Sequence, residues 1–284
     1  MTLACVFPGQ GSQSVGMLAS LSDIHPTFRA TFDEASEALD LDVWALSQEG
    51  PAEVLNATEN TQPALLTAGV AVWRAFQALG GPPAQALAGH SLGEFSALVC
   101  AGALGFADAV KLVQRRGRLM QEAVPAGQGA MAAILGLEDE EVEKACSDAA
   151  GDGVAVAVNY NSPGQVVVAG DTVAVGRAIE ACKARGAKRA VALPVSVPSH
   201  SPLMRPAAER FRADLARVVF QDPTIPVYAF DGGLYSGPDS IREGLYRQLF
   251  NPVRWSTIGG RIIGSGVGVV IEAGPDDQIG RAHV

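Results

Sequence analysis

The feature of this sequence with the clearest chemical potential is a serine in a glycine-flanked turn. GHSLG, residues 89–93, has the GxSxG form, in which a serine sits on a sharp turn between a strand and a helix. The apolar run at 84–89 predicts the strand, and a helical pattern begins at Leu92. Ser91 is therefore the candidate nucleophile. The amide of Leu92, free at the start of the helix, would donate a hydrogen bond to a developing oxyanion.

A serine hydroxyl needs a base, and the sequence holds four histidines. His25 is predicted in an early surface turn, and His283 is next to the last residue. His90 neighbours the serine, and we expect its side chain to point away into the sheet. His200 lies in PSHSP at the start of a new helix and follows the serine in the chain, as the histidine does in α/β-hydrolases. His200 is therefore the candidate base.

Arg116 is the residue that bears on the substrate. In the helix predicted at 108–121, the apolar stripe places Arg116 on the inward face, whereas Lys111, Arg115 and Arg118 fall on the other face. A buried guanidinium keeps its charge and needs a carboxylate partner. The sequence leaves two partners open: the carboxylate of a substrate, or an aspartate or glutamate of the chain itself.

Composition excludes several classes of function. The 284 residues are 48% hydrophobic and 18% charged, as expected for a protein with a sizeable core. A net charge of −9 argues against nucleic acid or an anionic membrane surface as a partner. The four cysteines show neither metal-ligand nor disulfide spacing, so we expect reduced thiols. Without a signal-peptide pattern or a run long enough to span a bilayer, the expected location is cytoplasmic.

The elements that must position these residues form two predicted units. Alternating strands and helices predict a parallel sheet covered by helices, with strands at 3–7, 84–89, 225–230 and 267–272 and helices at 27–39, 62–79, from 92 onward, up to about 219 and at 240–249. From residue 129 the order strand, helix, strand, strand, helix, strand predicts a ferredoxin-like unit. The predicted fold class is therefore α/β: a parallel-sheet, α/β-hydrolase-like large domain over 1–127 and 196–284, with a ferredoxin-like small subdomain inserted at 128–195. A cleft between two such lobes is a common place for a ligand.

Six segments carry a resemblance to a known family. They occur in the order FPGQGSQ, GHSLGE, QRRGRLMQEAVPAGQGAMAAILGL, NYNSPGQVVVAG, VSVPSHSPLM and RQLFNPVRW. Together they resemble the malonyl-CoA:acyl carrier protein transacylases of bacterial fatty acid synthesis. The resemblance covers nearly the whole chain up to about Gly274, and a run of six motifs is far more specific than any one of them.

The resemblance implies roles for the catalytic candidates. Ser91 would be the nucleophile, and His200 its general base and acid. The ring of His200 would be oriented by the main-chain carbonyl of Gln248, not by an aspartate. The implied reaction carries a malonyl group from malonyl-CoA to the phosphopantetheine thiol of acyl carrier protein through a malonyl-Ser91 ester.

It also implies how the substrate is bound. The backbone amides of Gln10 and Leu92 would form the oxyanion hole, and Arg116 would make a bidentate pair with the malonyl carboxylate. Malonyl-CoA and acyl carrier protein would be the partners, with no metal, other cofactor, nucleic acid or membrane involved, and we expect a monomer.

Two segments depart from the family pattern, and three alternatives stay open. VYAFDGGLYSGPDS, around Asp231, lacks the usual Asn-rich stretch, and GPDDQIGRAHV ends where members continue GPGKVL. The chain could instead be a serine hydrolase such as a thioesterase, which would carry an acidic partner between serine and histidine. It could be an acyltransferase that serves a polyketide synthase, or a non-catalytic docking subunit for carrier proteins.

Overall fold

The larger sheet has four parallel strands in the order β7-β2-β1-β8. They are β1 (Leu3–Phe7), β2 (Ala84–Gly89), β7 (Val227–Tyr228) and β8 (Val269–Glu272). Every residue of β1 is buried, as a continuous apolar run in a covered parallel strand predicts. In the register of this sheet Phe7 lies beside Gly89, so the loops that follow β1 and β2 leave at the same edge. The carboxyl edge of a parallel sheet is where α/β proteins bind ligands.

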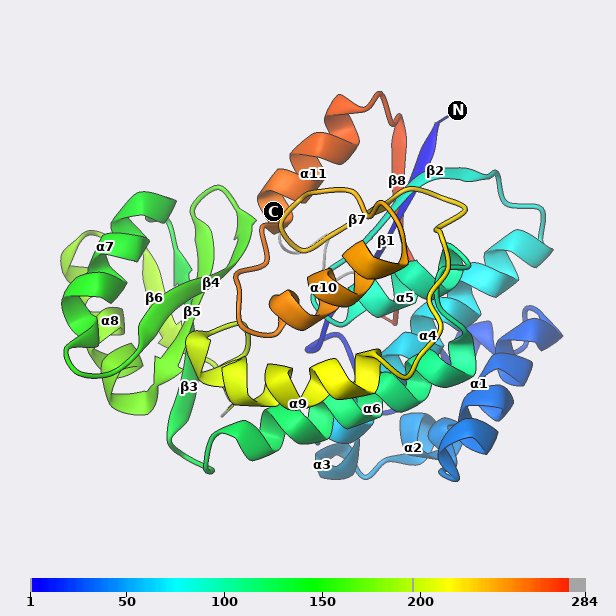
Figure 1. Ribbon diagram of the computed structural model, residues 1–284, viewed down its shortest axis with the longest axis horizontal. Coiled ribbons are helices and arrows are strands. Elements are labelled where there is room, and N and C mark those ends of the chain that lie inside the picture. Colours follow the sequence, from blue (N-terminus) through cyan, green and yellow to red (C-terminus); the bar gives the residue numbers. More distant parts are fainter. Residues whose placement is uncertain (1, 196, 276–284) are drawn as a thin grey trace.

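Helices cover both faces of this sheet. Side chains that alternate along β1 divide between two clusters: Cys5 and Phe7 pack with most of the helices, whereas Ala4 and Val6 pack with α11. The helices are α1 (Pro26–Leu39), α2 (Val43–Glu49), α3 (Ala52–Leu55), α4 (Thr58–Ala78), α5 (Gly93–Cys100), α6 (Phe106–Ala123), α9 (Arg205–Leu215), α10 (Pro238–Gln248) and α11 (Trp255–Gly264), with 3-10 turns η1 (Ala19–Leu21) and η2 (Pro202–Met204). Figure 1 shows α6 and α9 side by side, below α10.

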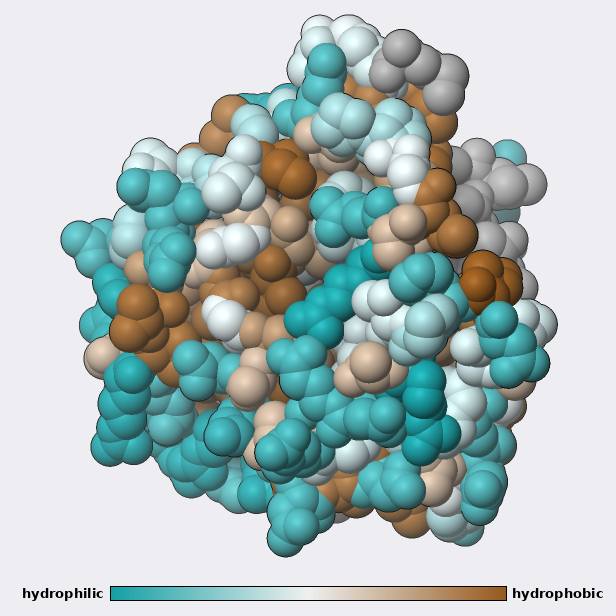
Figure 2. Space-filling view, turned by 90° about the vertical axis from the view of Figure 1, so that its right-hand side faces the viewer, coloured by the Kyte–Doolittle hydropathy of each residue, from teal (hydrophilic) through white to brown (hydrophobic). Residues whose placement is uncertain are grey.

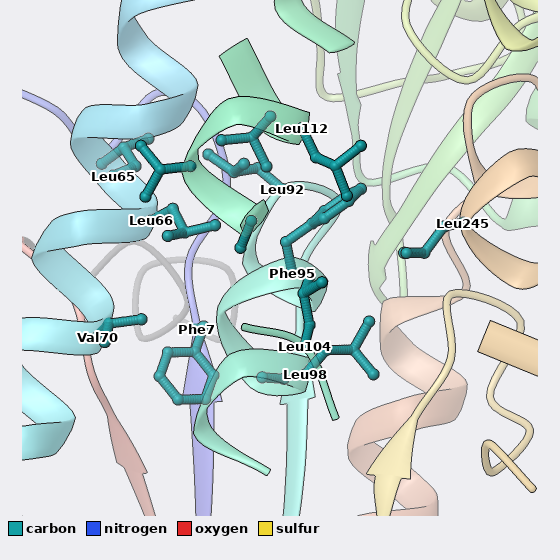
Figure 3. Close-up of a cluster of buried hydrophobic side chains, with 14 of the residues drawn as sticks. Phe7, Leu65, Leu66, Val70, Leu92, Phe95, Leu98, Leu104, Leu112 and Leu245 are labelled. Carbon is teal, nitrogen blue, oxygen red and sulfur yellow. The ribbon is translucent and has the colours of Figure 1, made fainter. Parts of the chain in front are cut away.

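Helix α5 is anchored in the main core. Leu92 caps its start and Phe95 lies in its first turn, and both extend toward Leu65 and Leu66 of α4 and Leu112 of α6 (Figure 3). All five side chains are buried in one cluster. Burying such side chains stabilises the fold by about 1.5–3 kcal/mol each. This packing fixes the position of the turn that precedes α5.

The smaller sheet is antiparallel, in the order β4-β5-β3-β6. Its elements are β3 (Gly129–Leu135), α7 (Asp139–Ala150), β4 (Ala155–Ser162), β5 (Gln165–Asp171), α8 (Thr172–Ala184) and β6 (Arg189–Ala192). Helices α7 and α8 cover one face, and the whole unit lies to the left of the larger sheet in Figure 1. The predicted fold class, a parallel-sheet α/β domain with a ferredoxin-like insertion, is confirmed. The domain boundaries stay a prediction.

Several predicted elements differ from the structure. Helices α2, α3 and α11 were not predicted, because α2 and α3 are short and two adjacent glycines interrupt the pattern of α11. Helix α4 begins four residues before the predicted start at 62, and Pro63 lies inside it, where proline removes one main-chain hydrogen bond of the helix. Helix α9 ends before 219, and β7 is shorter than the predicted strand at 225–230.

The structure describes residues 2–195 and 197–275. Residues 276–284 of the atypical end, with His283, and the predicted domain boundary at 196 therefore lie outside the described residues. Figure 2 shows the face opposite the small subdomain, where hydrophilic residues dominate the lower half and hydrophobic residues gather in the upper half. Within the described ranges, none of the helices is long and apolar enough to cross a membrane.

Candidate active site

Ser91 stands on a tight turn between β2 and α5. Its φ is 52°, a left-handed conformation that is uncommon outside glycine. The flanking glycines make the turn possible: a Cβ on Gly89 would lie 1.9 Å from the carbonyl carbon of Gly93, and a Cβ on Gly93 would lie 2.2 Å from the carbonyl oxygen of Phe7. The backbones of β1, β2 and α5 are therefore packed together at the turn, and Ser91 is held at its tip.

His200 lies beside the serine, 109 residues further along the chain. Its Nε2 is 2.7 Å from Ser91 Oγ, and its Nδ1 is 2.7 Å from the main-chain oxygen of Gln248. A carbonyl oxygen can only accept, so Nδ1 carries the proton and Nε2 is free to accept from the serine. The structure thus places Ser91, His200 and the Gln248 carbonyl side by side, the arrangement that the family resemblance implies.

The end of α10 supplies the carbonyl groups that hold His200. Gln248 is the last residue of this helix, where main-chain carbonyls have no partner within the helix. The carbonyl of Gln248 accepts from the ring of His200, and that of Leu249 accepts from its backbone N–H at 3.0 Å. His200 has a φ of 63°, so these two bonds keep it in a conformation that is otherwise unfavourable.

Arg116 is the largest fully buried side chain in the described residues, with 1% exposure. One end of its guanidinium donates to Gln62 Oε1 at 2.9 Å. Its Nη2 donates to Gln248 Oε1 at 2.9 Å and to Ser91 Oγ at 3.2 Å. No carboxylate in the described part of the chain lies within ion-pair distance of this group. The sequence had left an acidic residue of the chain open as a direct partner, and the structure places amide oxygens there instead.

Burial shifts the pKa values of the charged groups at this site. Desolvation, and next the nearby positive charge of Arg116, lower the pKa of His200 to about 3, so the ring is neutral at pH 7. Desolvation lowers the pKa of Arg116 itself to about 10, opposed by the charge of Glu94. A neutral histidine and a charged arginine are the states that a general base and an anion-binding group require.

A cavity of about 500 Å³ opens over the serine. The larger domain contributes Gln10, Ser91, Leu92, Arg116 and His200 to its wall, and the small sheet contributes Met131, Asn159, Asn161, Gln165 and Val167. Gln10 follows β1 and Leu92 follows β2, so the two residues predicted to form an oxyanion hole border the same cavity. Gln248 lies behind the wall and reaches the site through its bonds to His200 and Arg116.

The prediction for His90 was wrong. Its ring does not point into the sheet: Nε2 lies 3.0 Å from Asn161 Oδ1 on β4, and the ring packs 5.6 Å from that of Trp255. His90 borders the cavity that holds Ser91. The small subdomain offers a polar partner there that the sequence around the motif does not reveal. Burial lowers the pKa of His90, so this ring too is neutral.

Sequence reasoning missed the residues that surround Arg116. Gln62, the side chain of Gln248 and Glu94 are all buried, and each lies far from Arg116 in the chain. Their one sequence signal was a polar residue within an apolar segment, as for Glu94 directly after the GxSxG motif. In the described ranges no group of three or more His, Cys, Asp or Glu side chains could hold a metal ion, and Cys5, Cys100, Cys146 and Cys182 are free thiols.

A serine on a strand-to-helix turn, with a histidine at its hydroxyl and a parallel sheet beneath, is the geometry of enzymes that transfer acyl groups through serine. The family model of the acyl transferase domain matches residues 4–284. The malonyl CoA-acyl carrier protein transacylase of Escherichia coli (strain K12) is 56% identical over 273 residues, which cover 96% of this chain and 88% of that protein. The chain therefore belongs to the acyl transferase domain family and, within it, to the malonyl CoA-acyl carrier protein transacylases.

Solved structures agree with this assignment. The malonyl CoA-acyl carrier protein transacylase from Coxiella burnetii is 50% identical, with a TM-score of 0.98, over 99% of this chain and 90% of that one. A malonyl-transacylase solved in complex with a type II PKS acyl-carrier protein is 51% identical, with a TM-score of 0.98, over 99% of this chain and 92% of that one.

Proposed function

We propose that this chain transfers a malonyl group from malonyl-CoA to the phosphopantetheine thiol of acyl carrier protein and so supplies extender units for fatty acid synthesis. Its family membership, and the names of its relatives, support the reaction. The observation that carries the proposal at the site is the buried Arg116 beside the Ser91 hydroxyl. A fixed cation at that place suits an acyl group that ends in a carboxylate.

The first transfer loads the enzyme. Ser91 Oγ attacks the thioester carbonyl of malonyl-CoA while its proton passes to His200 Nε2. The oxyanion of the tetrahedral intermediate accepts hydrogen bonds from the backbone amides of Leu92 and Gln10. The carbon–sulfur bond then breaks, and the departing thiolate of coenzyme A takes the proton from His200. A malonyl-Ser91 ester remains.

The second transfer runs the same steps in reverse order with a new thiol. The phosphopantetheine thiol of the carrier protein gives its proton to His200 and attacks the ester carbonyl. When the intermediate collapses, the carbon–oxygen bond breaks and Ser91 recovers its proton from His200. In both halves Arg116 holds the malonyl carboxylate, which fixes the carbonyl in the oxyanion hole. Neither half needs a metal or a redox group, so we propose that the reaction uses no cofactor.

The site favours a transferase over a serine hydrolase. A hydrolase of this architecture carries an acidic residue on the ring nitrogen of its histidine, whereas here that nitrogen meets the carbonyl of Gln248. A hydrolase also has no need of a buried cation in the acyl pocket. A purely docking role would leave the bond between Ser91 and His200 without a use.

The free thiols and the acidic composition support a cytoplasmic location, which we include in the proposal.

A second carrier is worth testing, because one solved relative was crystallised with a type II PKS acyl-carrier protein. The experiment is a transfer assay with malonyl-CoA and two phosphopantetheinylated carriers, one from fatty acid synthesis and one from a polyketide synthase. We expect malonyl transfer to the fatty acid carrier with the higher kcat/KM. A higher kcat/KM for the polyketide carrier would reassign the pathway, and release of free malonate without transfer would support a hydrolase.

A further inference from the structure

A buried polar chain extends from Arg116 away from the cavity. It runs from Arg116 to Gln248, from Gln248 to Glu94, and from Glu94 to the hydroxyl of Tyr235. Arg116, Gln248 and Glu94 are at most 1% exposed, and Tyr235 is buried as well. Glu94 and Tyr235 do not line the cavity, so neither can touch a substrate in it. A buried carboxylate is costly, and Glu94 takes no part in either of the two acyl transfers.

The hydrogen bonds fix which way the Gln248 amide points. Its Nε2 faces two acceptors, Glu94 Oε2 at 2.6 Å and the main-chain oxygen of Ser91 at 2.9 Å. An ionised carboxylate and a carbonyl can only accept, so the nitrogen of the amide must lie on their side. The amide oxygen is then turned toward Arg116, where it accepts from Nη2 at 2.9 Å. Tyr235 donates to the other oxygen of Glu94 and keeps the carboxylate in place.

This arrangement leaves the guanidinium oriented and yet available. Two neutral amide oxygens, from Gln62 and Gln248, hold Arg116, while the nearest balancing charge, Glu94, acts from behind Gln248. A direct ion pair between Glu94 and Arg116 would compete with the carboxylate of a substrate. Because the Gln248 amide separates Glu94 from Arg116, the carboxylate balances the buried cation without taking up the N–H groups that a substrate carboxylate would use.

We propose that Glu94 is a positioning residue. It orients Arg116 through the side-chain amide of Gln248, and Tyr235 in turn anchors Glu94. This inference rests on the proposed malonyl transfer. Tyr235 lies in the segment after β7 that departs from the family pattern, so the segment has a use at the site. Without the carboxylate, only the main-chain oxygen of Ser91 still holds the Gln248 nitrogen, so the amide can more readily turn its nitrogen toward Arg116, which places donor against donor and displaces the cation.

The test is the ratio of malonyl to acetyl transfer in Glu94→Gln. The glutamine keeps the shape of Glu94, but only its oxygen can accept a hydrogen bond, because its terminal nitrogen is a donor. We expect kcat/KM for malonyl-CoA to fall about 10- to 100-fold, mainly through KM, since a hydrogen bond to a charged group is disturbed. Acetyl-CoA has no carboxylate for Arg116, so its kcat/KM should change less than threefold. Glu94→Asp should recover part of the ratio.

The pH profile gives a readout that a purely structural role would not move. Burial and the charge of Asp231 raise the pKa of Glu94 to about 7, opposed by the hydrogen bonds from Tyr235 and Gln248 and by the charge of Arg116. Below that pH the protonated carboxyl can donate to Gln248 and turn its amide. The ratio should therefore fall on acidification below about pH 7 in the wild type and stay flat in Glu94→Gln.

Tyr235→Phe tests the same idea with less disturbance, and Tyr246→Phe is its control. Tyr246 is also buried and donates to a glutamate, Glu209, but lies outside the chain from Glu94 to Arg116. We expect the malonyl-to-acetyl ratio to be lower in Tyr235→Phe and unchanged in Tyr246→Phe. This comparison holds even if Glu94→Gln does not fold. If the wild type prefers malonyl-CoA while Glu94→Gln and Tyr235→Phe leave the ratio unchanged, the positioning role is wrong and the proposed function stands. A wild type without that preference overturns the proposed function itself.

Discussion

At the scale of single residues, Gln248 links the proposed base, His200, to the proposed carboxylate-binding residue, Arg116. Its main-chain oxygen holds the ring of His200, and its side chain holds Arg116. A shift of this residue would therefore disturb the base and the cation together. The sequence predicted its main-chain role through family resemblance, but not the role of its side chain, which depends on contacts with residues more than 130 positions away.

The pH dependence of acylation tests the state of His200. Because the pKa of His200 is lowered to about 3, its neutral form persists when the pH falls below the usual value of 6.5. With acetyl-CoA, which has no carboxylate for Arg116 to bind, kcat/KM should stay level from pH 8 to pH 5. Rapid-quench measurement of acetyl-enzyme formation checks this. An acid limb centred near 6.5 would contradict the assigned environment of the base.

Arg116→Ala tests whether Arg116 binds the malonyl carboxylate. Removing a charge-assisted pair in a desolvated site costs about 2–5 kcal/mol for the malonyl group. Acetyl transfer should fall far less, so the ratio of the two rates isolates the carboxylate contact from damage to the fold. Arg116→Lys should restore part of the preference, because a point charge cannot form two parallel hydrogen bonds. Equal slowing of both substrates would make Arg116 a structural residue.

At the scale of elements, the turn at Ser91 depends on the close approach of three backbones. The sequence revealed the strand, the turn and the helix, because GxSxG is a local pattern. It could not reveal that α11 covers the far face of the sheet or that His90 meets the small subdomain, since both follow from packing between distant segments.

Gly93→Ala tests the close packing of this turn. Its new Cβ would lie 2.2 Å from the carbonyl oxygen of Phe7, so β1 and α5 would have to move apart. We expect a loss of unfolding free energy of about 1–3 kcal/mol or more, with loss of acylation. Gly260→Ala is the matched control, because Gly260 is an exposed helical glycine with nothing within 4 Å of an added Cβ. Similar denaturant midpoints for the two variants would contradict the account of the turn.

At the scale of the whole molecule, the cavity belongs to both sheets. The larger domain contributes Ser91, Arg116 and His200 to its lining, and the smaller sheet contributes amide side chains such as Asn159 and Asn161. The alternation of elements predicted this two-unit architecture from the sequence. The size of the cavity and the polar chain behind Arg116 could not be predicted, because each is made of residues that no single motif contains.

Stability against acid depends on groups with opposed effects. His90 and His200 have lowered pKa values, so below about pH 6.5 the unfolded chain takes up protons that the native state cannot, and stability falls. Glu94 has a pKa raised to about 7, so the native state binds its proton first and gains stability from pH 7 down to about 4.5. Glu94→Gln removes that opposing effect. Urea titrations at pH 7 and pH 5 should show a larger loss of unfolding free energy on acidification in the variant than in the wild type, and an equal or smaller loss would contradict the raised pKa.

Acyl-enzyme mapping tests whether a malonyl group passes through Ser91. The protein is mixed with malonyl-CoA, quenched and digested, and the modified peptide is located by mass spectrometry before and after addition of phosphopantetheinylated carrier protein. We expect a malonyl ester on the peptide that contains GHSLGE, lost when the carrier gains the group, and no label in Ser91→Ala. A label on a cysteine peptide, or transfer to the carrier that survives in Ser91→Ala, would contradict this role of Ser91.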